Sequence, residues 1–158
     1  MITNARQYRI TKAALGRLQE NLAAHDVRDP GRDVDPRIHQ VMRDAISSEA
    51  EDLRAELHHY EQLRDGHITE RQITSLRELP TALIEARIAA RLTQREIAQR
   101  VGVADQQIQR WEANSYAGVN LGRLQSIADA LAIHIHQTIT YTPAARASGS
   151  PEETPHDE

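Results

Sequence analysis

The sequence predicts a mainly α-helical protein: an N-terminal helical segment with one long helix, then a unit of four to five short helices, then one C-terminal β-strand. The 158 residues include no Phe and one Trp, and they are rich in Ala, Leu, Arg, Glu and Gln, which favours helices over sheets. Apolar residues recur at spacings of three and four in residues 11–24 and 36–65, as on one side of a helix. After residue 132 the apolar period changes to two, which is typical of a strand.

Residues 1–66 are predicted to form the N-terminal helical region, with a role in dimerisation or partner binding. Thr11 can cap a helix that runs to about Ala24, and the Asp-rich stretch 26–35 with its Pro-Gly pair predicts a loop. Asp35 and Pro36 then begin a long helix that ends near Gly66. This helix would be ~45 Å long, more than a small domain is wide. Its apolar stripe therefore calls for a partner, and a second subunit is one candidate.

The rest of the chain divides into four predicted parts. Residues 67–80 are a connector with a helix over 70–78 after a Thr69 cap, and residues 81–132 are the unit of short helices, whose first helix spans 81–91 after Pro80. Residues 133–142 are a strand, which must pair with another strand; its twin across a two-fold axis is the simplest choice. Residues 143–158, rich in Ala, Ser, Pro and Glu, predict a disordered acidic tail.

Residues 92–112 are the most informative stretch of the chain, because they predict two short helices joined by a glycine turn. Thr93 is a good N-cap, and Glu96, three residues later, completes a capping box. Gly102 ends the first helix where the backbone needs a positive φ. In the second helix, from Asp105 to about Asn114, Ile108 and Trp111 are three apart and face the core.

Polar side chains occupy the rest of that second helix and would look away from the core. Amide and guanidinium groups pair bidentately with adenine and guanine in the major groove of DNA. The residues with this placement are Asp105, Gln106, Gln107, Gln109 and Arg110. We predict base contacts from this set; the alternatives are that the amides only keep an exposed helix soluble, and that Asp105 caps the helix.

The order and spacing of these residues resemble the Xre, or Cro and phage-repressor, type of bacterial helix-turn-helix regulator, from about Leu79 to Ile133. The resemblance implies phosphate contacts near the two ends of the motif, and a structural set that includes a pair linking Arg87 to Glu112. The phosphate set is Thr93, Gln94, Arg95, Asn114 and Ser115, and the structural set is Arg87, Gly102, Ile108, Trp111 and Glu112. The alternative for the pair is two unrelated surface charges.

The sequence departs from the pattern of this family at three places. Ala104 stands where Ser or Thr usually caps the second helix, so the cap would fall to Asp105. Ala132 stands where Gly commonly follows the last helix. The loop 114–120 has no Lys or Arg, although such loops often touch phosphates in this family.

The charge of the chain sets a limit on DNA affinity. The formal net charge is -4, and residues 81–131 hold six arginines against five carboxylates. Phosphate neutralisation supplies most sequence-independent affinity for DNA, so a monomer is expected to bind weakly and to need dimerisation.

Composition also argues against several other classes of protein. Cysteine is absent, which rules out disulfides and thiolate metal sites. No apolar run has membrane-spanning length and no signal-peptide core is evident, so a cytoplasmic protein is expected. His134 and His136 share one side of the predicted strand but lack further ligands, so we expect no metal and no cofactor. No catalytic arrangement is evident, and we expect no enzyme activity.

Three functions fit the sequence. The first is a dimeric repressor that reads double-stranded DNA at a pseudo-palindrome, with half-sites ~34 Å apart. The second is an antitoxin whose acidic stretch 44–65 meets a basic toxin. The third is a protein-protein adaptor that keeps the fold without binding DNA. Either the long helix or the strand would make the dimer.

Overall fold

The computed structural model describes residues 1–27 and 35–141. Most of the predicted loop 26–35 and all of the predicted tail 143–158 lie outside the described residues. No helix in the described ranges is both long and apolar enough to cross a membrane.

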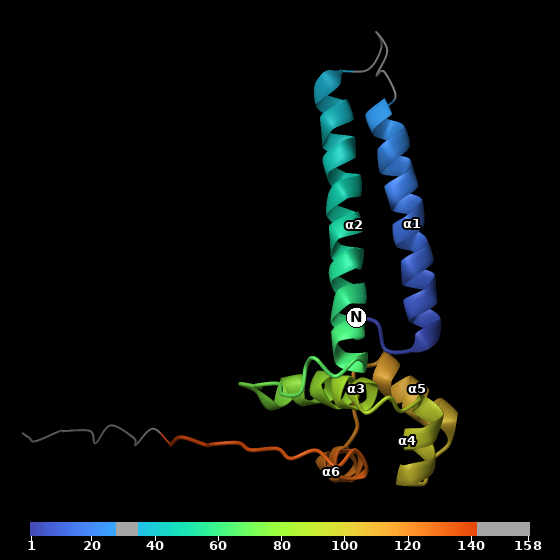
Figure 1. Ribbon diagram of the computed structural model, residues 1–158. Coiled ribbons are helices and arrows are strands. Elements are labelled where there is room, and N and C mark those ends of the chain that lie inside the picture. The colour runs from blue at the N-terminus through green and yellow to red at the C-terminus, as the bar shows by residue number, and fades with distance from the viewer. Residues whose placement is uncertain (28–34, 142–158) are drawn as a thin grey trace, which may run out of the picture.

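Two long helices, α1 (Ala5–Val27) and α2 (Pro36–Arg64), lie side by side and stand on a unit of short helices (Figure 1). The long helix predicted from residue 36 is confirmed, with Asp35 accepting a hydrogen bond from the Arg37 backbone N–H. The predicted start of the first helix at Thr11 was wrong, because the Asn4 side chain already accepts the Gln7 backbone N–H at 2.9 Å and caps the helix seven residues earlier.

The base of this hairpin is packed and its upper part is not. Leu57, Tyr60 and Leu63 of α2 are buried together with Ile2, and the Tyr8 ring stacks on Tyr60 at 5.2 Å between centroids. In contrast, none of the described residues between 5 and 49 is buried. The hairpin therefore shares the core of the unit below it but has little core of its own.

The connector between α2 and the short helices differs from the prediction. No α-helix forms over 70–78; within that range only a 3-10 turn, η1 (Leu76–Glu78), is present, and Thr69 caps nothing. The physical reason is local: Ser75 and Glu78 form their own capping box, and Glu78 also accepts from the Thr74 backbone N–H, so helical structure starts only there. The next helix, α3 (Leu79–Ala89), starts two residues before Thr81 and takes Pro80 into its first turn, where a missing N–H costs nothing.

A buried carboxylate ties the hairpin to the short helices. Glu85 of α3 is 5% exposed and bonds both His59 of α2, at 3.0 Å, and Arg71 of the connector. These bonds fix the base of α2 against α3.

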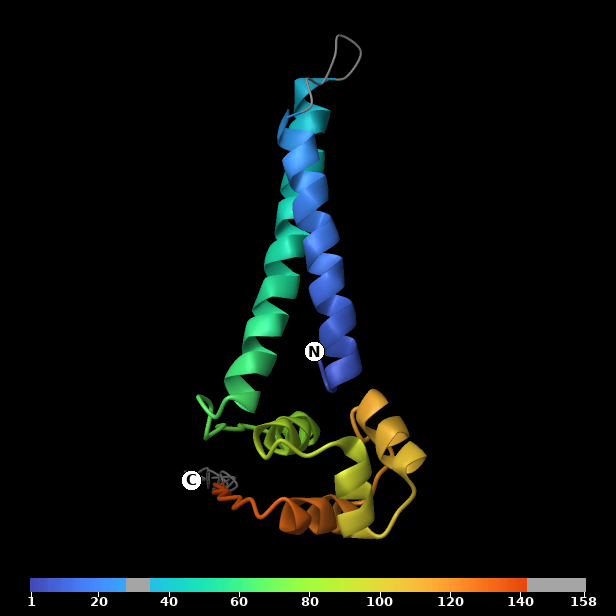
Figure 2. The same cartoon turned by 45° about the vertical axis from the view of Figure 1, so that its right-hand side comes forward.

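Three more helices complete the unit: α4 (Gln94–Val101), α5 (Asp105–Ala113) and α6 (Leu121–Ala130) (Figure 2). Asn120 caps α6 by accepting a hydrogen bond from the Arg123 backbone N–H. The innermost side chains come from every helix of the unit, namely Leu83, Ile84, Ile97, Ile108 and Ile127. One core thus holds all four helices in place.

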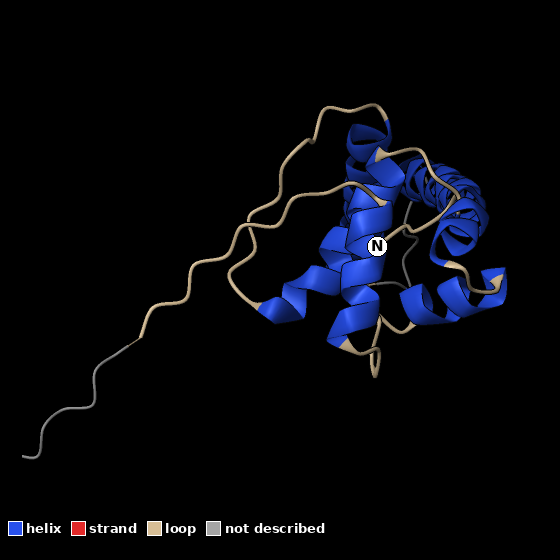
Figure 3. Cartoon of the chain, turned by 90° about the horizontal axis from the view of Figure 1, so that it is seen from below, coloured by secondary structure: helices blue, strands red, loops and turns tan. Residues whose placement is uncertain are grey.

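The predicted C-terminal strand is wrong for the described residues. The chain leaves α6 as a loop, and no strand occurs in the described ranges (Figure 3). Ile135, Ile139 and Tyr141 are exposed instead. An alternating sequence forms a strand only when a second backbone accepts its hydrogen bonds, and no described segment does so.

The end of α6 contains a strained residue at a predicted position. Ala132 has φ of 55°, and the backbone N–H groups of Ala132 and Ile133 bond Asp129 and Ala128, the pattern of a Schellman cap. We expect Ala132→Gly to raise the free energy of unfolding by about 0.5–1 kcal/mol, because Gly adopts this conformation without a Cβ clash. Urea unfolding of the variant and the wild type measures this change in the free energy of unfolding. Ala24→Gly, at an exposed helical position, should instead lower stability, and a loss at both positions would contradict the argument.

Candidate nucleic-acid interface

The turn between α4 and α5 has the local geometry that the sequence predicts. The Thr93 backbone N–H donates to Glu96 Oε2 at 2.7 Å, and the Glu96 N–H donates to Thr93 Oγ1 at 3.2 Å. The bonds from the Thr93 backbone and hydroxyl hold the pKa of the Glu96 carboxyl below its usual range. Gly102 has φ of 70°, so α4 ends in the left-handed conformation that Gly allows. These contacts fix where α4 begins and ends, and so the direction in which the chain enters α5.

Helix α5 is held by its inner side. Ile108 has no exposed surface, and Trp111 is partly buried beside Tyr116, with 6.4 Å between the ring centroids. The expected cap by Asp105 is not formed: Ala104 is the N-cap residue, and no side chain bonds the first turn. The Asp105 carboxylate instead lies 3.9 Å from Arg95 Nε, because its position inside the helix turns it away from the free N–H groups.

The five predicted base-contacting residues all lie on α5. Gln106, Gln109 and Arg110 are exposed, whereas Asp105 and Gln107 are half-buried. The outer side of α5 therefore offers two amides and one guanidinium group to a partner, which is the set of donors and acceptors that reads purine edges in DNA.

Four of the five predicted phosphate-contacting residues are exposed around the same helix: Thr93, Arg95, Asn114 and Ser115. Gln94 differs. Its amide Nε2 donates to Glu112 Oε2 at 2.8 Å, so in the free protein the side chain turns inward. Its backbone N–H, at the start of α4, still lies where a helix terminus favours an anion.

The pair between Arg87 and Glu112 is formed and is buried. Both side chains belong to residues that are 3% exposed, and two bonds of 2.6 Å join them in a bidentate arrangement. Arg87 also donates to the backbone oxygens of Leu92, at 2.9 Å, and Thr3, at 2.7 Å. The alternative of two unrelated surface charges was wrong. The pair joins α3, α5, the start of α4 and the N-terminus of the chain.

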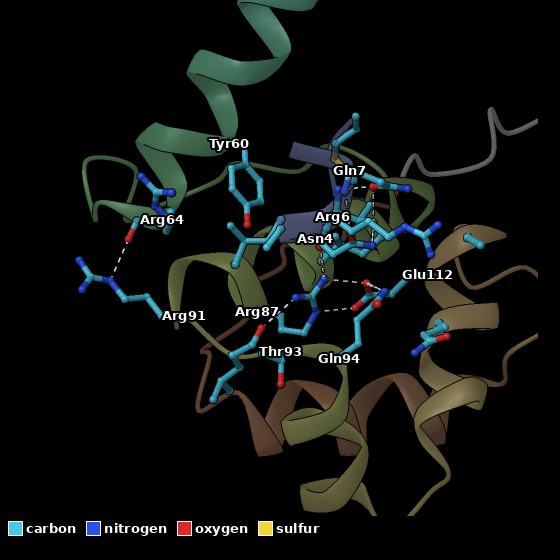
Figure 4. Close-up of a pocket in the computed structure, with 18 of the residues that line it drawn as sticks. Asn4, Arg6, Gln7, Tyr60, Arg64, Arg87, Arg91, Thr93, Gln94 and Glu112 are labelled. Carbon is cyan, nitrogen blue, oxygen red and sulfur yellow. Dashed lines mark hydrogen bonds and ion pairs between the residues drawn. The ribbon is translucent and has the colours of Figure 1, made fainter. Parts of the chain in front are cut away.

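Sequence reasoning missed the part of this surface that the N-terminus provides. An open hollow of about 990 Å³ lies where the hairpin meets the short helices, and Arg6, Arg64 and Arg91 line it together with Gln94 and Arg95 (Figure 4). A signal for it was present: the first 19 residues contain four Lys or Arg residues and no Asp or Glu.

The fold is that of a helix-turn-helix unit, in which α4 supports α5 and α5 presents polar side chains. Comparison with protein families agrees: residues 83–137 match the family model described as Helix-turn-helix. This stretch is therefore a DNA-binding domain of the Xre/Cro-type helix-turn-helix family, as the resemblance implied. Searches of curated proteins and of solved structures each gave no match.

Proposed function

We propose that the protein is a dimeric transcriptional repressor that reads a palindromic operator through the major groove and blocks the promoter. The observation that carries this proposal is that α5 has a buried inner side and an exposed polar outer side. Ile108 and Glu112 are buried on its inner side, while Gln106, Gln109 and Arg110 are exposed on the outer side. A helix fixed in this way can enter a groove without rearrangement, so its side chains meet base edges in a defined register.

Phosphate contacts would set that register. The exposed residues Thr93, Arg95, Asn114 and Ser115 lie at the start of α4 and after α5, on either side of the reading helix. Such contacts position a protein on the duplex but carry no sequence information. Sequence preference is therefore assigned to α5.

The hairpin α1–α2 is the proposed dimer contact. Its upper part has no buried residue among those described, and Ile38, Val41 and Met42 are each more than half exposed. A second hairpin packed on these positions would give a four-helix arrangement that buries them. Two copies on a two-fold axis would also double the phosphate contacts, which the weak charge of residues 81–131 requires.

The experiment is a footprint of the full chain on the DNA upstream of its own gene, at two salt concentrations. We expect a protected inverted repeat bound by two chains, as sedimentation of the complex would report. Gln106→Ala and Arg110→Ala should each cost about 1–3 kcal/mol of binding free energy, because each removes one base contact. Gln125→Ala, an exposed glutamine of α6, is the matched control and should have no effect. No protection at low salt would refute operator binding and favour the adaptor.

A second candidate, an antitoxin that also represses its own operon, rests on α2. Glu49, Glu51 and Asp52 are exposed and form no ion pair with a described residue. Such a carboxylate cluster steers association with a basic partner protein. DNA binding through α5 is common to both candidates, so the footprint tests that shared part.

A further inference from the structure

We propose that the N-terminal end of α1 is a second contact with the DNA backbone, in which Arg6 binds a phosphate that flanks the bases read by α5. The inference rests on the proposed function and extends it to a segment outside the helix-turn-helix domain. It assigns a role to residues that the family match, which begins at residue 83, does not cover.

Position is the first argument. The lower end of α1 lies next to α5 in both views (Figures 1 and 2). Arg6 lines the same hollow as Gln94 and Arg95 at the start of α4 and as Gln109 of α5. A duplex that meets α5 and the start of α4 would therefore pass within reach of the Arg6 side chain.

Charge is the second argument. The hollow is lined by five arginines and two carboxylates, and each carboxylate has its own arginine partner. Asp65 bonds Arg64 Nε at 3.1 Å, and Glu112 bonds Arg87. Arg6 is exposed and forms no ion pair with a described residue. The side chains that line the hollow therefore carry a net positive charge, and Arg6 is available to bind an anion of a partner molecule.

The placement of Arg6 does not serve helix stability, which is the third argument. Arg6 is in the first turn of α1, a turn that contains no acidic residue. The N-terminal end of a helix carries partial positive charge, so a cation there is unfavourable and an anion is favoured. A phosphate bound at this end offsets both the partial positive charge of the helix terminus and the charge of Arg6. Arg9, three residues on and also exposed, continues the basic row.

The N-terminus is held in place, so it acts as part of a surface. Ile2 is 3% exposed, the Thr3 carbonyl accepts from Arg87, and the Met1 ammonium pairs with Glu56 at 2.7 Å. These contacts fix the start of α1 against the helix-turn-helix domain. A preplaced cation loses less conformational entropy on binding than a free arm would.

The test measures the affinity of the full chain for its operator duplex over a series of salt concentrations. Arg6→Ala should lower affinity at low salt and reduce the slope of log K against log salt by about 1 per protomer. The ratio of wild-type affinity to variant affinity should therefore fall by about threefold per lost contact as the salt rises from 50 to 200 mM. Arg6→Lys should keep most of the slope. Phosphate ethylation interference should show one flanking phosphate per half-site that matters for the wild type and not for Arg6→Ala.

Arg17→Ala is the matched control, because Arg17 is exposed on the same helix ~16 Å further from the domain. Two results would overturn the inference, provided that Arg110→Ala still weakens binding. One is a salt slope for Arg6→Ala equal to that of the wild type, and the other is a change in slope for Arg17→Ala as large as that for Arg6→Ala. If the wild type bound no duplex, or if Arg110→Ala had no effect, the proposed function itself would fail. Circular dichroism confirms that each variant is folded.

Discussion

We expect Arg87→Ala to lower the free energy of unfolding by about 3–5 kcal/mol, because the change leaves the Glu112 carboxylate buried without its partner. Glu112 is 3% exposed, and its carboxylate would lose the two bonds that Arg87 donates. The variant also leaves the carbonyls of Leu92 and Thr3 without the donors that bind them. Urea unfolding of the full chain gives the difference.

Two further variants make this prediction specific. Arg43→Ala removes an ion pair with Asp26 whose side chains are 41% and 43% exposed, and it should leave the free energy of unfolding almost unchanged because water screens the pair. The double variant Arg87→Met with Glu112→Leu should recover much of the lost stability, because no unpaired charge then remains in the core. A cost for Arg87→Ala no greater than that of Arg43→Ala would show that the buried pair is not the main connection.

Ile108→Ala is expected to cost about 2–5 kcal/mol, because it opens a cavity at a side chain with 0% exposure in a core shared by α3, α4, α5 and α6. Ile108 is also the most deeply buried residue of α5, the helix proposed to read DNA. The variant should therefore lose operator affinity as well as stability, whereas Gln106→Ala loses affinity alone.

Leu121→Ala is the control for this core substitution, since Leu121 begins α6 and is 65% exposed. Its cost should be small, because surface substitutions away from special features stay within about 0.5 kcal/mol. Equal losses at Leu121 and Ile108 would contradict the assignment of Ile108 to the core. The urea midpoints of the two variants, compared at the same m-value, measure the two losses of stability.

The helix-turn-helix part of this fold was predictable because its signals are local. The capping box of Thr93 and Glu96 and the left-handed Gly102 depend only on residues a few positions apart, and both are confirmed. The burial of Ile108 followed from helical spacing. The base-contacting and phosphate-contacting roles stay predictions, since they concern a partner molecule.

The errors have two causes: a competing cap a few residues away moved two helix starts, and the strand needs a contact that a local pattern does not contain. The alternation after residue 132 suits a strand, but no described segment supplies the second backbone. The connector begins its helical turn only at Ser75, and the first helix begins earlier than Thr11 because Asn4 competes for the capping role. In each case the pattern alone did not show which of several possible caps or partners the structure uses.

The sequence by itself determined the type of domain in this protein, because caps, glycine turns and apolar spacing act over one or two turns of helix. Only the tertiary structure decided that Arg87 and Glu112 are buried, and that the first residues of the chain lie beside α5. The reason is that burial and long-range proximity depend on how elements pack, and Thr3 and Arg87 are 84 positions apart. Residues at such separations meet only when the whole core forms.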